Sequence, residues 1–295
     1  MPWVVVDTRT ELLVVARSAY RRNDWRTSYE SFSRVEGVQP LDTDDLAVFA
    51  AVAWRQGHGR EALRINERVH TRLLRTDPVM AAMKAAEIGL AWLARGHVAL
   101  ARNWAQRAGV LLQGVPEVAA HGYLVYLDAV AAADGGAPAA LAPGARELAG
   151  IAGRVADGAL ATLARVLDGL AADTGGFATL DDVLLPTLDE RVPVEWAGDV
   201  YRRALGAAQR HGDGARLRSW TQSMQRWCET TQAGSTESAY RAICDVHRLT
   251  AESATDPGEL VRRSVDLRRL VSEVDAVAAG LVERLLARGM GHAAR

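Results

Sequence analysis

The sequence repeats one pattern along its length: a helical stretch of about 14 residues, a short turn with Gly or Asn, and a second helical stretch. The first three turns lie at Asn23, Gly57 and Gly96, which are 34 residues (23 to 57) and 39 residues (57 to 96) apart. Such a period is typical of arrays in which each helical hairpin packs only against its neighbours. Because the chain is also rich in Ala, Leu and Arg and poor in residues that favour strands, we predict an all-α solenoid.

The first copy of this pattern, residues 11–40, is the clearest. Its turn and second helix, residues 23–35, read NDWRTSYESFSRV and resemble the tetratricopeptide-repeat (TPR) pattern G-D-Y-x-x-A-x-x-x-Y-x-x-A. In such a unit a turn residue tolerates a left-handed backbone, small residues let two helices cross closely, and large residues fill the gap to the next repeat. The small and large residues that we assign to these roles are Ala16, Ser28, Trp25 and Phe32.

The pattern is looser after residue 115. There we expect helix pairs at 117–133 with 137–153, 157–172 with 177–188, 195–211 with 215–230, and 238–251 with 258–271. We expect Pro143-Gly144 to distort the second of these helices, and Pro186 to close the helix that begins at residue 177.

A last helix, 272–287, has no partner in this scheme, as is usual for the cap of such an array. The resulting prediction is a right-handed α-solenoid of about seven TPR-like hairpins plus a C-terminal capping helix. The linkers are short, so we predict one superhelical domain over 1–295, with clearer TPR repeats in 1–115 and divergent repeats and the cap in 116–295.

Two segments of the second half carry a more specific resemblance. Residues 219–229 (SWTQSMQRWCE) and 240–248 (YRAICDVHR) are similar to helices in the sensor array of actinobacterial transcription regulators that end in a LuxR-type helix-turn-helix domain. This chain contains no arginine-rich recognition helix after the array. The resemblance therefore implies a sensor or interaction array without its output domain, and no direct contact with nucleic acid.

The sequence contains few residues in the arrangements that are typical of catalytic or metal sites. The sequence has no nucleophile elbow, phosphate-binding loop or paired-carboxylate motif of the kind that catalysis uses, so we do not expect an enzyme or a cofactor. Cys228, Cys244 and His247 could approach one another and bind zinc, but a fourth ligand is not evident. We favour buried core cysteines with a hydrogen-bonded histidine over a metal site.

The inner groove of such an array is the expected binding surface. Aligning the repeats by their turns assigns to it Arg17, Tyr20, Arg21, Trp54, Arg55, Tyr123, Tyr126, Arg202, Gln209 and Arg210. Arginines beside aromatic rings suit a peptide with carboxylate groups, although a solvated face with packing aromatics explains the same pattern. We therefore expect a scaffold that binds a partner protein or peptide in a regulatory or assembly role. The alternative is a small-molecule or signal-peptide sensor acting on transcription through a separate DNA-binding partner.

The net charge and the number of cysteines indicate where in the cell the protein functions. The formal net charge of −1 gives no field that would attract nucleic acid or an anionic membrane. The two cysteines are too few for a disulfide framework, and the first residues do not have the form of a signal peptide. We expect a cytoplasmic protein without membrane contact, and a homo-oligomer is compatible with these features.

Overall fold

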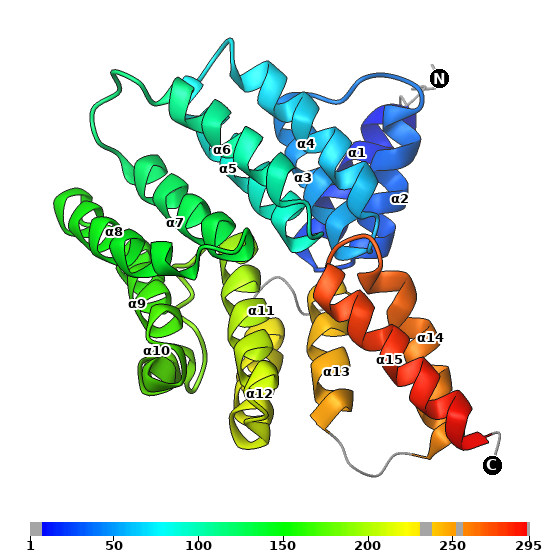
Figure 1. Ribbon diagram of the computed structural model, residues 1–295. Coiled ribbons are helices and arrows are strands. Elements are labelled where there is room, and N and C mark those ends of the chain that lie inside the picture. Colours follow the sequence, from blue (N-terminus) through cyan, green and yellow to red (C-terminus); the bar gives the residue numbers. More distant parts are fainter. Residues whose placement is uncertain (1–7, 231–237, 252–255, 294–295) are drawn as a thin grey trace.

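The computed structural model describes residues 8–230, 238–251 and 256–293, and within these ranges it is helical without strands (Figure 1). Its α-helices are α1 (Thr8–Arg21), α2 (Trp25–Glu36), α3 (Thr43–Arg55), α4 (Gly59–Leu73), α5 (Pro78–Ala94), α6 (Val98–Leu111), α7 (Ala119–Asp134), α8 (Leu141–Val155), α9 (Gly158–Ala171), α10 (Phe177–Leu184), α11 (Val194–Arg210), α12 (Gly214–Thr230), α13 (Ala239–Ala251), α14 (Pro257–Val271) and α15 (Ala276–Ala293). Two short 3-10 helices, η1 (Pro138–Ala140) and η2 (Asp173–Gly176), precede α8 and α10. Consecutive helices pack against each other, which confirms the all-α, solenoid-like architecture.

The first hairpin is built as the sequence indicates. Asn23 has a φ of 60° in the turn between α1 and α2, the left-handed conformation that this residue type tolerates. Ser28 and Ala16 are both fully buried where the two helices cross, and the Ser28 hydroxyl donates to the Ala16 carbonyl over 3.0 Å. Trp25 and Phe32 are buried to within 1% of their surface, and each contributes about 1.5–3 kcal/mol by leaving water.

Two proline expectations turn out differently. Pro143 does not distort its helix, because it lies in the first turn of α8, where the missing N–H has no partner to lose. The helix that begins at Phe177 ends at Leu184, ahead of Pro186, so α10 is shorter than the expected 177–188. Both differences concern the loop-rich stretch where the sequence pattern is weakest.

The C-terminal helix is not an unpartnered cap. It begins at Ala276, because Asp275 caps its N-terminus by accepting a hydrogen bond from the Ala278 amide over 2.7 Å. From there α15 packs along α14 and also contacts α13. The last two helices therefore form a hairpin of their own.

This C-terminal hairpin returns to the N-terminal repeats. In Figure 1 the path runs from α1 through α7 and α12 and back, so that α14 and α15 lie beside the ends of α3 and α4. The contact is a close backbone approach, since a Cβ added at Gly59 would be 2.1 Å from the Glu273 carbonyl oxygen, and one at Gly57 would be 3.0 Å from Leu270. Glu273 also accepts from the Arg60 amide over 3.2 Å. The solenoid is thus closed on itself.

No helix in the described ranges is long and apolar enough to cross a membrane.

Candidate functional site: a cavity inside the closed solenoid

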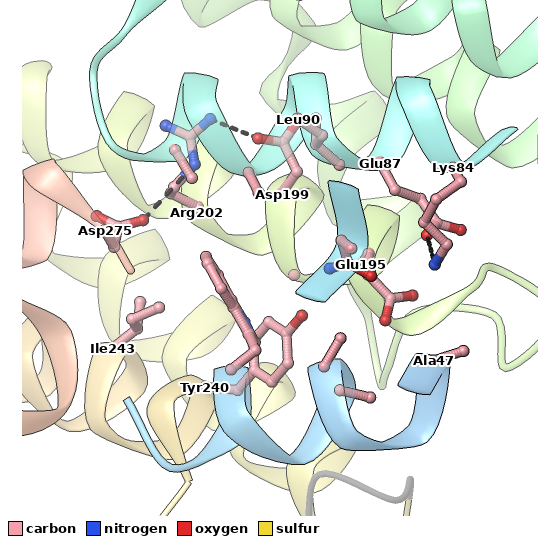
Figure 2. Close-up of a pocket in the computed structure, with 17 residues that line it drawn as sticks. Ala47, Lys84, Glu87, Leu90, Glu195, Asp199, Arg202, Tyr240, Ile243 and Asp275 are labelled. Carbon is pink, nitrogen blue, oxygen red and sulfur yellow. Dashed lines mark hydrogen bonds and ion pairs between the residues drawn. The ribbon is translucent and has the colours of Figure 1, made fainter. Parts of the chain in front are cut away.

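Closure of the solenoid leaves a cavity of about 110 Å³ in its interior. The walls come from α3, α4, α5, α11 and α13, and the turn between α14 and α15 adds Asp275 (Figure 2). Five of the lining residues are alanines, whose small side chains leave the space open, and the others include aromatic, charged and branched aliphatic side chains. A concave site with a few convergent polar groups is the usual form of a small-ligand site.

An ion pair on α5 forms one end of the cavity. Lys84, the only lysine of the chain, donates to Glu87 one helical turn away, and both side chains keep some exposure, at 17% and 23%. Burial raises the pKa of Glu87, and the neighbouring carboxylates of Glu87 and Glu195 raise the pKa of Lys84 although burial opposes them. The Glu195 carboxylate lies beside this pair in Figure 2 and makes no hydrogen bond or ion pair with any part of the described chain.

A buried hydrogen-bond network forms the other end. The Asp199 carboxylate accepts from the Tyr126 hydroxyl over 2.9 Å and from Arg203 Nε over 2.7 Å, and Arg202 donates to its other oxygen. Arg203 also donates to Asp134 on α7 over 2.9 and 3.1 Å. Burial alone would raise the pKa of Asp199, but the two arginines lower it to about 2. The carboxylate is therefore held ionised, and it ties α7 to α11.

The network continues to the C-terminal hairpin. Arg202 Nε lies 3.7 Å from Asp275 Oδ2, and neither atom has a hydrogen-bond partner. Burial raises the pKa of Asp275. The residue that caps α15 thus also forms part of the cavity wall, which links the closing hairpin to the site.

Aromatic side chains form the wall between these ends. Tyr240 on α13 and Trp54 on α3 both line the cavity, and the ring of Tyr240 extends into it in Figure 2. The ring packs directly on α11, because a Cβ at Gly198 would be only 2.3 Å from its Cε1 atom. Burial raises the pKa of the Tyr240 hydroxyl, so this group stays neutral and can donate.

The structure brings only two of the proposed groove residues to this cavity, Trp54 and Arg202. Three others are buried within the fold. Arg55 lies over the Trp25 ring at 5.0 Å, Tyr123 packs on Trp196 with ring centroids 4.7 Å apart, and Tyr126 bonds Asp199. Arg55, Tyr123 and Tyr126 are only 3%, 5% and 0% exposed. They therefore do not face an open groove, contrary to the expectation.

The remaining groove candidates lie apart. Arg17 forms a two-bond pair with Asp45 over 2.8 and 2.7 Å, and Tyr20 contacts Trp25 edge-on. Arg21 and Arg210 are exposed and Gln209 is half-buried. The ten residues therefore do not form one surface, because the curvature of the array carries equivalent positions to different surroundings.

The cysteine and histidine group is part of the core. Cys228 and Cys244 are buried and free, and the Cys244 thiol donates to the Thr221 carbonyl over 3.4 Å. His247 is fully buried as expected, but neither ring nitrogen has a hydrogen-bond partner, so the expected bonded histidine is wrong. Burial, helped by Arg202, lowers the pKa of His247 to about 4. No group of His, Cys, Asp and Glu in the described ranges could hold a metal ion.

Comparison with protein-family models, with curated proteins and with solved structures finds no match for the chain. Its function has to be inferred from the site itself.

Proposed function

We propose that this chain is a sensor module: a right-handed array of TPR-like hairpins that binds a small ligand in its interior cavity. Ligand binding would change how the module interacts with a separate partner protein. The resemblance to regulator sensor arrays suggests that this partner binds DNA. We also propose a cytoplasmic location, since the two cysteines are buried thiols without a disulfide.

One observation carries this proposal: the C-terminal hairpin closes on the N-terminal repeats around the cavity. In an open array the inner surface is available to an extended peptide, whereas here helices separated by most of the sequence surround a space suited to a small molecule. Because Asp275 belongs both to the cavity wall and to the closing turn, a bound ligand would stabilise the closed form.

A cavity-filling variant tests the proposal. Ala91 on α5 lines the cavity, so Ala91→Phe places a ring inside it, while Ala142→Phe adds the same ring to an exposed position of α8. We expect compounds from a small-metabolite library to raise the melting temperature of the wild type and of Ala142→Phe but not of Ala91→Phe. The proposal would be contradicted if no compound raises the melting temperature of the wild type, or if the compounds that do so stabilise Ala91→Phe equally well.

The scaffold function remains a second candidate because of a groove lined by α4 and α6. The groove has a volume of about 950 Å³ and is lined by Leu74, Trp104 and Val110, with Arg107 over the Trp104 ring at 4.5 Å. An apolar floor with an arginine at its side suits a peptide that carries an acidic group. A photo-crosslinking residue in place of Val110 should then label a partner polypeptide. The same residue in place of Val265, which is similarly exposed but outside the groove, should not. Equal labelling from both positions would contradict the scaffold function.

A further inference from the structure

The cavity wall carries more negative than positive charge. Its positive side chains are Lys84 and Arg202, and its negative ones are Glu87, Glu195, Asp199 and Asp275, so the ionised lining has a net charge of −2. Just behind the wall, Arg203 and Asp134 pair with each other, while the buried Arg55 near Tyr240 adds one positive charge, so the balance falls from −2 to −1 and stays negative. A ligand with a positive charge would therefore be favoured over a neutral or negative one of the same shape.

The two surplus carboxylates lie at opposite ends. Lys84 pairs with Glu87, and Asp199 pairs with both Arg202 and Arg203. Asp275 has only the long ion pair with Arg202 at 3.7 Å, and Glu195 has no ion pair within the described ranges. Glu195 is exposed and makes no hydrogen bond or ion pair in the described ranges, so an entering group could reach it.

Asp275 points to a ligand independently of the charge balance. Its side chain is 2% exposed. Its Oδ2 atom lies 3.7 Å from Arg202 Nε, and neither of these two atoms has a hydrogen-bond partner. Buried carboxylate oxygens are normally hydrogen-bonded, and an unpaired one costs about 1–3 kcal/mol. A donor supplied from the cavity would satisfy this oxygen.

The space between the carboxylates is apolar and aromatic. Trp54 and Tyr240 offer ring surfaces, and Ile243, Leu90 and the alanines of α3 and α5 complete the wall. Ring faces attract cations and also pack on methylene groups. The shape therefore suits a charged head on a short apolar stem.

We infer that the cavity binds an organic cation with a short apolar stem: Glu195 receives an ammonium or guanidinium head at one end, and a hydrogen-bond donor at the other end of the stem reaches Asp275 Oδ2. This inference rests on the proposed function and specifies its ligand class. The raised pKa values of Glu87 and Asp275 agree with it, since burial opposes their ionisation in the free protein and a bound cation would offset that cost.

The single lysine gives a direct probe of the site. Labelling the full chain with [15N]lysine produces one backbone amide signal, that of Lys84 on the cavity wall. Three probes with the same stem and different charge, n-butylammonium, n-butanol and butyrate, are titrated at neutral pH and low ionic strength. We expect n-butylammonium to shift the Lys84 signal to saturation with an affinity at least ~10-fold higher than that of either other probe.

A matched pair of variants tests the role of Glu195. Glu195→Gln removes one carboxylate from the cavity, and Glu190→Gln makes the same change at an exposed position outside it. Glu195→Gln should weaken the binding of n-butylammonium about 2- to 5-fold, as expected for a partly exposed ion pair, while Glu190→Gln leaves its affinity unchanged.

The outcomes separate this inference from the proposed function. Tighter binding of butyrate or n-butanol would overturn the cation and leave a small-ligand cavity standing. Equal effects of the two glutamate variants would overturn the role of Glu195. If none of the three probes shifts the Lys84 signal, both the inference and the small-ligand site are contradicted.

Discussion

The carbonyl oxygen of Glu273 occupies the place where a side chain at Gly59 would begin, since a Cβ at that glycine would be only 2.1 Å away. The C-terminal hairpin and the second repeat thus meet backbone to backbone. This contact closes the solenoid, and the cavity depends on it.

Gly59→Ala should disturb the closure directly. The new methyl group meets backbone atoms that cannot rotate away, so we expect a loss of about 1–3 kcal/mol in the free energy of unfolding, measured by urea denaturation. Gly109→Ala is the matched control, because its Cβ would meet only Leu124 Cδ2 at an ordinary 3.6 Å inside α6. The control should be neutral or slightly stabilising. Equal effects of the two changes would mean that the Gly59 contact does not form.

Asp199 is expected to be the most sensitive position of the network. Asp199→Asn leaves Arg202 and Arg203 buried with less compensation, which should cost about 3–5 kcal/mol of unfolding free energy. Tyr126→Phe removes one hydrogen bond to the same carboxylate and should cost only about 1 kcal/mol. Calorimetric melting of both variants measures the two losses in unfolding free energy. Similar losses would contradict the prediction that Asp199 is the most sensitive position of the network.

His247 makes stability depend on pH. Its pKa is about 4 in the folded chain against 6.5 for an ordinary histidine, so the unfolded chain binds the proton more tightly. Stability is therefore lost as pH falls from about 6.5 to 4, by up to roughly 3 kcal/mol. His247→Leu should flatten this part of the pH profile, whereas the exposed His97→Leu should keep the wild-type slope. Equal pH profiles of the wild type and His247→Leu between pH 6.5 and 4 would contradict the buried neutral histidine.

The two cysteines should be unreactive in the folded protein. Cys228 and Cys244 are buried, and burial raises the pKa of Cys244 to about 12, so almost no thiolate forms at neutral pH. A thiol reagent at pH 7.5 should label neither residue until urea unfolds the chain, when both should react. Rapid labelling without urea would show that α12 and α13 separate readily.

Sequence and structure agree where the pattern is local. The periodicity and the turn residues predicted all four boundaries of α11 and α12 to within one residue, because Gly212 and Gly214 separate two strongly periodic stretches. The small and large residues of the first hairpin also have the roles that their spacing indicates. These features depend on neighbours in the chain.

The closure could not be predicted, because it depends on the curvature summed over all repeats. In the sequence Gly59 simply follows the turn at Gly57, and nothing local connects it to Glu273, although the Arg60 amide donates to the Glu273 carboxylate 213 positions away. For the same reason the sequence missed Glu195 and Asp275 as cavity residues. Lys84 was the one available signal, since a single lysine among so many arginines marks an unusual position.

The distance between α4 and α15 tests the closed, cavity-forming solenoid most directly. Arg64 and Arg284 are exposed on these helices, and the native cysteines are buried, so Arg64→Cys/Arg284→Cys accepts spin labels at two known sites. Pulsed electron-electron double resonance on the full chain should give one narrow distance distribution. A broad distribution that extends to long distances would show an open array and contradict the account.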